Sequence, residues 1–479
     1  MKKIVVAMDS MKGCLDSYEA SEYAADGAYE MWPDAEIIHR QVSDGGEGMV
    51  YMMVMRFKEE DLISNMVSGP LGEKVNPIWV VLKEEGCLCA YMDFSSAAGL
   101  TLIDEDKRNP LRTSSYGVGE MINDALKAGI ENVRLGLGGS ATVDAGLGAL
   151  QAMGLRLLDA EGNELPSPIT GGMLSDVADM ECPMDFKEKI SRLKLMLLCD
   201  VEAPFTGENG AARVFGPQKG ADSDEVEILE KGMENIRLLI LDKTGIDLNS
   251  RLGSGAAGGA AGGLMALAGG EIKKGASTLL DLSGFEKDIE GADLIITGEG
   301  SSDRQTLMGK IPYEILQRGK KRNIPVWLVA GRIKDREALL EAGFERIICI
   351  NSPDIVWRSD TVGLDPMDPE VARRRLSALL LDEEENDEGG EDKGDVGYGI
   401  GDGEGEVGDF GAEDVLYGAD GGYATARSCH TPQHFGCREP EDAVSYEDAY
   451  HNAEEGQEQP YGYNGDAGFM QSGHQGAPG

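Results

Sequence analysis

Short apolar runs alternate with longer amphipathic segments at the start of the chain. Residues 4–8 and 37–42 have the length and composition of buried strands, and residues 16–31 between them have the spacing of a helix. Asp16 and Glu19 at the start of that helix have the spacing of a capping box. A strand–helix–strand order builds parallel sheets. The pattern therefore predicts the first unit of a parallel α/β domain.

The same alternation returns near residue 290. Further strands are predicted over residues 294–297, 326–330 and 346–350, followed by a last helix over 369–381. We therefore expect residues 1–65 and 290–382 to form one α/β domain with a parallel, Rossmann/flavodoxin-like sheet.

The pattern changes between these two parts of the chain. Residues 78–82 and 87–93 alternate like paired strands, and Thr113 is a suitable N-cap for a helix that ends near residue 128. More strands are predicted over 133–137 and 194–199, and a long helix over 222–243. Residues 66–289 therefore predict a second α/β domain, inserted into the first.

Residues 253–270 are almost entirely glycine, alanine and leucine. Gly253, Gly255 and Gly258 match the spacing of a dinucleotide-binding fingerprint, but no strand is predicted before them, and that fingerprint requires one. We predict a closely packed helix instead. Its N-terminus would still have free N–H groups that could bind a phosphate.

Charge is distributed unevenly along the 479 residues. The whole chain has a net charge of −42, and residues 383–479 contain 24 acidic and 3 basic residues, a net charge of −21. The polar, glycine-rich composition of this segment predicts a disordered tail. The acidic balance argues against nucleic acid and membrane as partners, since both attract basic surfaces. The partner of the tail is unknown from the sequence.

The tail also contains four side chains that could bind a metal ion, namely Cys429, His430, His434 and Cys437. Their spacing differs from that of common zinc sites, and we expect a chance cluster. The chain start has no signal-peptide pattern, no apolar stretch is long enough to cross a bilayer, and the eight cysteines are scattered. These features predict a cytoplasmic protein with reduced thiols.

Ionisable side chains gather where the predicted strands end. The loop 43–48 places two carboxylates among three glycines between a strand and a helix. Because ligands of open parallel sheets bind beyond the carboxyl ends of the strands, we expect these loops to form the site. The candidates in the first domain are Asp9, Ser10, Lys12, Asp44, Glu47, Glu299, Asp303, Gln305 and Arg332, and those in the inserted domain are Ser140, Asp144 and Asp200.

The composition of this set excludes several chemistries. His39 is the only histidine before the tail, and we expect it to be structural, so neither a Ser-His-Asp triad nor a histidine-based zinc site is available. No P-loop string occurs. Carboxylates, lysines and glycine-rich loops suit a magnesium nucleotide and a hydroxylated acid. Phosphoryl transfer, which depends mainly on positioning and charge neutralisation, fits the set.

Six motifs together resemble the glycerate kinase family of type I, the bacterial glycerate 2-kinase-like group. They are MDSMKGCLDSYEA, VSDGGEG, GLGGSATVDAGLGAL, CDVEAPFTGENGAARVFGPQKGA, LGSGAAGGAAGG and ITGEGSSDRQTLMGK, in this order within residues 1–382. The resemblance implies two α/β domains with the site in a cleft between them. It also implies transfer of the ATP γ-phosphate to D-glycerate, giving 2-phosphoglycerate.

Roles can be assigned to the candidates as hypotheses. Lys12 and Lys310 would bind phosphate or the glycerate carboxylate, and Asp44 or Asp200 would act as the base or as a Mg²⁺ ligand. The loops 138–140 and 253–259 would bind phosphates. The remaining binding candidates are Asp9, Ser10, Glu47, Gly138, Gly139, Ser140, Asp144, Gly255, Glu299, Asp303 and Gln305.

Two alternatives remain at this stage. The substrate could be a related small hydroxy acid, because the pocket residues do not separate these acids. The chain could also be a non-catalytic protein that binds a nucleotide or metabolite and presents the acidic tail. Ser301 and Ser302, where the family usually has a basic and an apolar residue, keep that second alternative open.

Overall fold

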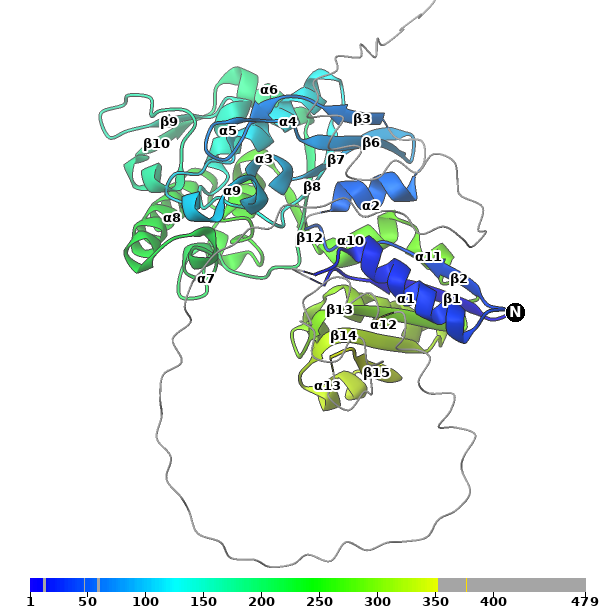
Figure 1. Cartoon of the computed structure of the whole chain (residues 1–479). Helices are drawn as coiled ribbons and strands as arrows, with labels where there is room; N and C mark the ends of the chain where they lie inside the picture. The colour runs from blue at the N-terminus through cyan, green and yellow to red at the C-terminus, as the bar shows by residue number, and fades with distance from the viewer. Residues whose placement is uncertain (12–13, 47, 58–60, 352–375, 377–479) are drawn as a thin grey trace, which may run out of the picture. The chain divides into compact units, whose positions relative to one another are not determined.

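The computed structural model describes residues 1–351, except 12–13, 47 and 58–60, and also residue 376 (Figure 1). Two candidate residues, Lys12 and Glu47, lie outside the described residues. The predicted tail, its Cys/His cluster and nearly all of the predicted helix over 369–381 lie outside them as well.

The first sheet contains five strands in the order β15-β14-β13-β1-β2, and every pair is parallel. The strands are β1 (Lys3–Met8), β2 (Glu36–His39), β13 (Leu294–Ser302), β14 (Val326–Ile333) and β15 (Arg346–Cys349). The predicted parallel α/β sheet is therefore confirmed. The third predicted strand is longer than expected, so Glu299 lies within β13 rather than in a loop.

Helices cover both faces of this sheet because the interior strand β1 is apolar at every position from Ile4 to Met8. Ile4 and Val6 of β1 pack against α1 (Ser17–Met31), while Val5 and Ala7 pack on the opposite face with α10 (Gly275–Leu282) and α12 (Ile311–Arg322). The shorter helices α11 (Phe285–Asp288) and α13 (Arg336–Glu341) complete this part. The predicted capping box at Asp16 forms and fixes the start of α1.

The second sheet has the order β12-β11-β8-β7-β6-β3. Its strands are β3 (Asp61–Ser64), β6 (Ile78–Glu84), β7 (Cys87–Asp93), β8 (Asn132–Gly136), β11 (Lys194–Leu198) and β12 (Glu271–Lys273). The pairs β3–β6 and β6–β7 are antiparallel, and the other pairs are parallel. Two small ribbons pair β4 (Val67–Ser68) with β5 (Lys74–Val75) and β9 (Arg156–Leu158) with β10 (Asp179–Glu181).

Sheet membership shows where the chain passes from one sheet to the other. Residues 61–64, which the sequence assigned to the first domain, pair with β6 of the second sheet. Helix α2 (Met49–Arg56) packs on β6 and β7 as well. Helix α10 contributes Leu280 to the first core and Leu279 to the core under α2. We propose domain boundaries near residues 43 and 274 in place of 65 and 290.

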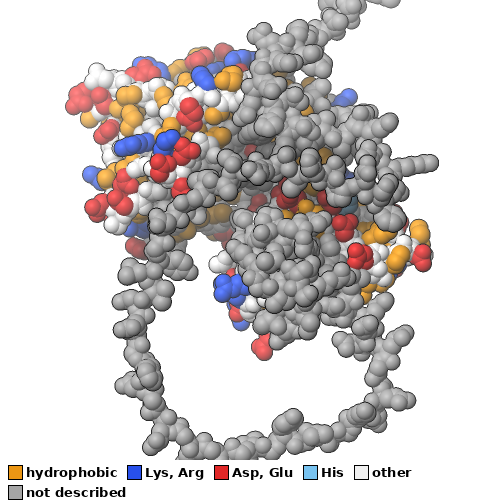
Figure 2. Space-filling view, viewed as in Figure 1, with side chains coloured by type: hydrophobic (Ala, Val, Ile, Leu, Met, Phe, Trp, Pro, Cys, Tyr) orange, Lys and Arg blue, Asp and Glu red, His pale blue; other side chains and the backbone are white. Residues whose placement is uncertain are grey.

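The surface of the described part mixes both signs of charge. On the face shown in Figure 2, Asp and Glu side chains are interspersed with Lys and Arg over the described atoms. Within the described residues, no helix has the length and apolar character needed to cross a membrane.

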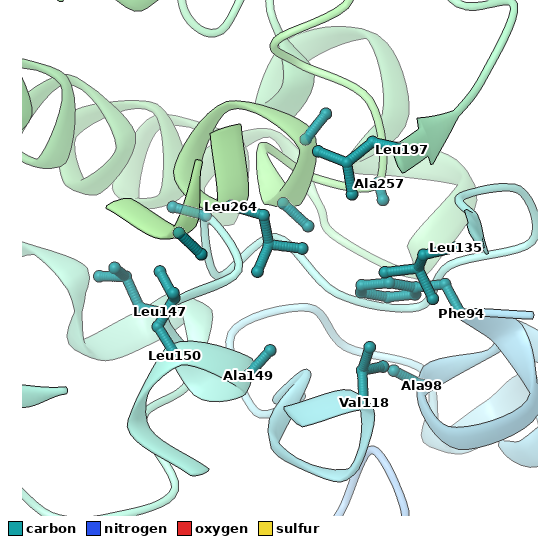
Figure 3. Packing of buried hydrophobic residues seen from close by; sticks show 14 of the residues in the cluster. Phe94, Ala98, Val118, Leu135, Leu147, Ala149, Leu150, Leu197, Ala257 and Leu264 are labelled. Atoms are coloured by element: carbon teal, nitrogen blue, oxygen red, sulfur yellow. The ribbon is translucent and has the colours of Figure 1, made fainter. Parts of the chain in front are cut away.

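The largest core lies in the second sheet and the helices that cover one face of it. These helices are α3 (Ser95–Ala98), α4 (Tyr116–Lys127), α5 (Leu147–Met153), α6 (Met184–Arg192), α7 (Ala211–Phe215), α8 (Ser223–Thr244) and α9 (Ala260–Ala268). Figure 3 shows Phe94 beside Leu135 and small side chains such as Ala149 and Ala98 between the helices. Small residues let the helices and loops approach closely, which brings the glycine-rich loops together.

Two local predictions were wrong. Helix α4 begins at Tyr116 with Ser115 as its N-cap, and the Thr113 hydroxyl instead donates to the carbonyl of Ala141. The predicted helix over 253–270 begins only at Ala260, because Gly259 adopts a left-handed φ of +86° and ends the preceding turns. In both places a tertiary contact or a backbone conformation outweighed the local sequence signal.

Candidate active site

The loop 43–48 packs directly against the glycines that follow β8. The Gly138 N–H donates to the Gly45 carbonyl at 3.2 Å. A Cβ added to Gly138 would lie 2.3 Å from the Gly46 Cα, which no side chain can tolerate. Glycine at 138 is therefore required for this close backbone contact. The loop that carries Asp44 is held against the carboxyl end of the second sheet.

Asp200 lies at the N-terminus of α10 through its carboxylate, and Asp44 lies there through its backbone carbonyl. Asp200 follows β11, and its Oδ2 accepts a hydrogen bond from the Ala276 N–H at 2.9 Å. The Asp44 Oδ1 accepts from the Gly46 N–H at 2.8 Å, and a Cβ on Gly275 would lie 1.7 Å from the Asp44 carbonyl oxygen. Partial positive charge at a helix N-terminus stabilises nearby carboxylates. The structure thus brings these two predicted residues together.

Burial makes Asp200 an unusual carboxyl group. Desolvation raises the pKa of Asp200 to about 7, the Ala276 amide works against this rise, and the charge of Asp44 adds to it. Its second oxygen, Oδ1, is buried and has no hydrogen-bond partner among the described residues. Buried polar atoms are nearly always paired, so this oxygen is suited to a bound ligand.

The donor set fits a magnesium ion that is held mainly by its substrate. Carboxylate oxygens are ligands of Mg²⁺, which proteins often bind through one or two carboxylates and the phosphates of the substrate. The unpaired Asp200 Oδ1 and the neighbouring Asp44 meet that description. The described residues contain no group of three or more His, Cys, Asp or Glu side chains arranged for a metal ion. Substrate oxygens and water would have to complete the coordination.

Glu299 forms a second group of polar contacts, on β13 of the first sheet. Its side chain is buried at the end of β13, where Oε2 accepts from the Lys310 ammonium at 3.0 Å. Its Oε1 accepts from the hydroxyls of Ser302, at 3.0 Å, and Thr306. Glu299 is therefore committed to holding Lys310 at the start of α12, rather than being free to contact a ligand.

Lys274 is a cation that the sequence analysis missed. It is the N-cap of α10, its Nζ lies 3.3 Å from the Glu202 Oε1, and the same Nζ lies 3.2 Å from where a Cβ on Gly309 would be. It therefore lies between the Asp200 loop and the residue before Lys310. No strand or helix is predicted around residue 274 from the sequence, so no local pattern pointed to it.

Most of the remaining candidates of the first sheet lie in local turns, but Arg332 lies within β14, paired with Ser301 of β13, rather than in the loop after it. The Ser10 N–H donates to the Asp9 Oδ1, and the Asp9 N–H donates to the Gly298 carbonyl, which fixes the end of β1 beside β13. The Gln305 N–H donates to the Asp303 Oδ1. These contacts place Asp9 at the carboxyl edge of the sheet, as predicted, and give Asp303 a turn-forming role.

Asp144 is sequestered from any ligand in this structure. It is fully buried, and its carboxylate accepts from the Ser115 N–H, the Ser115 hydroxyl and the Gly146 N–H. Desolvation raises its pKa, and these hydrogen bonds counteract the rise. The proposed ligand-binding role of Asp144 gains no support from this geometry, which instead ties two loops together.

The second glycine loop is also closely packed. A Cβ on Gly255 would lie 2.2 Å from the Pro204 carbonyl oxygen, and the Gly255 N–H donates to the Ala203 carbonyl. Gly139 differs, because it is exposed and has a left-handed φ of +69°. Gly255 is thus explained by packing, while Gly139 remains accessible.

Comparison with known proteins identifies the family. The model of the glycerate kinase family matches residues 4–358, which include all of the described site. The chain is 37% identical over 349 residues to a glycerate kinase of Bacillus subtilis (strain 168), covering 73% of this chain and 90% of that protein. It is 38% identical over 361 residues to the glycerate 2-kinase of Escherichia coli (strain K12), covering 74% and 93%.

A solved structure agrees with the fold. The crystal structure assigned to glycerate kinase 2 from Salmonella typhimurium LT2 is 33% identical, with a TM-score of 0.64, and covers 79% of this chain and 96% of that one. The match to the family model ends at residue 358, before the acidic tail. This chain therefore belongs to the glycerate kinase family.

Proposed function

We propose that this protein transfers the γ-phosphate of ATP to D-glycerate, with 2-phosphoglycerate as the product. The family match over residues 4–358 carries the proposal. The carboxylates and lysines at the strand ends support it, because phosphoryl transfer depends on positioning and on neutralising charge.

The carboxylate pair is suited to proton transfer. A carboxylate that accepts the proton of the attacking hydroxyl works best with a pKa near the working pH, and Asp200 has a pKa of about 7. Asp44 lies close enough for its negative charge to add to the rise that burial causes in the pKa of Asp200. We assign proton acceptance and metal binding to this pair jointly.

The two lysines are suited to binding the anionic groups. Lys310 is held by Glu299 at the start of α12, and Lys274 lies beside Gly309. Both present ammonium groups that can bind phosphate or carboxylate oxygens. A bound Mg²⁺ would neutralise charge on the phosphates, with Asp44 and Asp200 as its protein ligands.

The activity can be tested by coupled ADP release. We expect ADP release with ATP, Mg²⁺ and D-glycerate, and weaker release with other small hydroxy acids. Phosphorus NMR of the product identifies the position of the new phosphate. Absence of ADP release with every acid in the panel would contradict the proposed function.

Substitution of the carboxylates tests their role. We expect Asp44→Asn and Asp200→Asn each to lower kcat by about 100-fold or more, the usual size of a lost acid–base group. Asp159→Asn is a matched control, because Asp159 lies in an exposed turn beside β9. Near-normal turnover in both site variants would refute the assignment.

A further inference from the structure

The clearest feature that the proposed reaction does not yet use is a buried lysine behind the loop after β8. Lys219 is only 3% exposed, and its ammonium donates to the Ser140 hydroxyl at 2.9 Å and to the Thr142 carbonyl at 2.8 Å. An ammonium has three donors. The described residues provide partners for two of them and no ion pair.

A contribution to folding stability does not account for a lysine buried at this position. Removing an ammonium from water is costly unless a carboxylate compensates it. Asp144 is the acidic group whose charge acts on Lys219, and its oxygens already accept hydrogen bonds from Ser115 and Gly146. A methionine would fill the same space at lower cost. The buried positive charge therefore suits a negative charge supplied from outside the chain.

The loop in front of Lys219 has the donors to receive such a charge. The amides of Gly139 and Ser140 are adjacent, and neither has a hydrogen-bond acceptor among the described residues. Gly139 is exposed and left-handed, a conformation found in backbone nests that bind anions. The Ser140 hydroxyl accepts from Lys219, so its own hydrogen is available to donate.

This loop also lies beside the carboxylate pair. Gly138, one residue before Gly139, contacts Gly46 of the Asp44 loop. The Leu137 N–H donates to the Leu198 carbonyl, two residues before Asp200. An anion bound at residues 139–140 would therefore lie at the same sheet edge as Asp44 and Asp200.

We propose that Gly139, Ser140 and Lys219 form an oxyanion-binding site for a phosphate or carboxylate oxygen of a substrate. The two amides and the Ser140 hydroxyl contact the anion, and Lys219 is a positioning residue that orients the hydroxyl and supplies positive charge behind it. The inference rests on the proposed phosphoryl transfer, in which both substrates are anions.

The test measures KM for ATP and for D-glycerate separately in Lys219→Met. We expect one KM to rise about 10-fold or more, as for the loss of a charge-assisted hydrogen bond, while the other stays within twofold. A rise for ATP assigns the anion to a phosphate, and a rise for D-glycerate assigns it to a carboxylate. Ser140→Ala should raise the same KM by a smaller factor, and Lys219→Arg should partly restore it.

A matched control and a stability measurement separate this role from a purely structural one. Lys189→Met removes another lysine that donates to a backbone carbonyl, that of Met153, and should leave both KM values unchanged. Lys219→Met should unfold at the same temperature as the wild type or higher, since it removes a buried charge. The inference fails if neither KM rises more than twofold, or if both rise equally with a lower unfolding temperature.

Direct binding keeps this inference distinct from the proposed function. Calorimetric titration with ADP, inorganic phosphate and D-glycerate compares the wild type with Lys219→Met in the absence of turnover. If the wild type released no ADP with any acid, the proposed function would fail, but weaker binding of one of these anions by the variant would still support the oxyanion site. Equal binding of all three anions by both proteins would overturn it.

Discussion

At the scale of single residues, burial decides what each ionisable side chain does. Asp200 and Asp144 are both aspartates at the ends of strands or loops, and desolvation raises the pKa of both. Asp144 has its oxygens occupied by three donors, while Asp200 keeps one oxygen unpaired. The first is therefore a structural group and the second is available for chemistry. Sequence alone cannot separate them, since the difference lies in neighbours from distant segments.

Glu299 gives a direct test at this scale. Glu299→Gln keeps the shape of the side chain but removes the charge that pairs with Lys310 at 3.0 Å. We expect kcat/KM to fall about 10- to 100-fold, because a charge-assisted hydrogen bond contributes about 1.5–3 kcal/mol. The steady-state ADP assay measures this. Glu337→Gln on the exposed surface of α13 is the control, and equal kcat/KM values for the two variants would contradict the role given to Glu299.

Lys219 predicts a dependence of stability on pH. Burial lowers the pKa of Lys219 to about 7 from 10.5, and Asp144 is the charged group that opposes this. Between these pH values the unfolded chain holds the proton more firmly than the folded chain, so stability rises with pH. Lys219→Met lacks this titration. Its stability advantage over the wild type in urea unfolding should be largest near pH 6.5 and should shrink toward pH 9.5, and an advantage independent of pH would contradict the prediction.

At the scale of elements, helix α10 holds the site together. Its first residues contact Asp44 and Asp200, and Leu279 and Leu280 pack in two different cores. The sequence predicts no helix over these residues, although Lys274 is the N-cap and Gly275 the first residue of α10 in the structure. What defines α10 is its contact with both sheets, which a local pattern does not contain.

Gly275→Ala tests this role. The new Cβ would lie 1.7 Å from the Asp44 carbonyl oxygen, so either the helix or the loop must move. We expect a loss of kcat of about 100-fold, the cost of misplacing a catalytic group by about 1 Å. Gly162→Ala is the control. Gly162 has a left-handed φ of +83°, which disfavours alanine, but an added Cβ would meet no other atom there. That variant should lose some stability and keep its activity, and matching activities in the two variants would argue against a role for α10.

At the scale of the whole molecule, a cluster of ion pairs joins the two segments that connect the sheets. Asp288 of α11 is almost buried and accepts hydrogen bonds from Arg40, which follows β2, and from Arg56, which ends α2. Arg40 and Arg56 flank the segment that leaves the first sheet, and Asp288 belongs to the segment that returns to it. Two arginines of the outgoing segment therefore meet an aspartate of the returning segment, more than 200 residues later in the chain.

Asp288→Asn should weaken this cluster. Breaking a buried pair is costly, but both arginines are partly exposed, so we expect a loss of about 1–3 kcal/mol in the free energy of unfolding. Urea unfolding measures it. Asp104→Asn breaks the exposed pair with Lys107 and should have no measurable effect. If the two variants were equally stable, the cluster would not fasten the crossing segments.

The sequence by itself determined the parallel sheet, the helices α1, α4 and α8, and the family. These follow from apolar periodicity, from caps such as Asp16, and from motifs that are local in the chain. Only the tertiary structure decided which carboxylate is unpaired, that Lys219 is buried behind Ser140, and where the chain passes between the sheets. Burial and pairing depend on neighbours hundreds of residues away, such as Arg40 and Asp288, so no local pattern contains them.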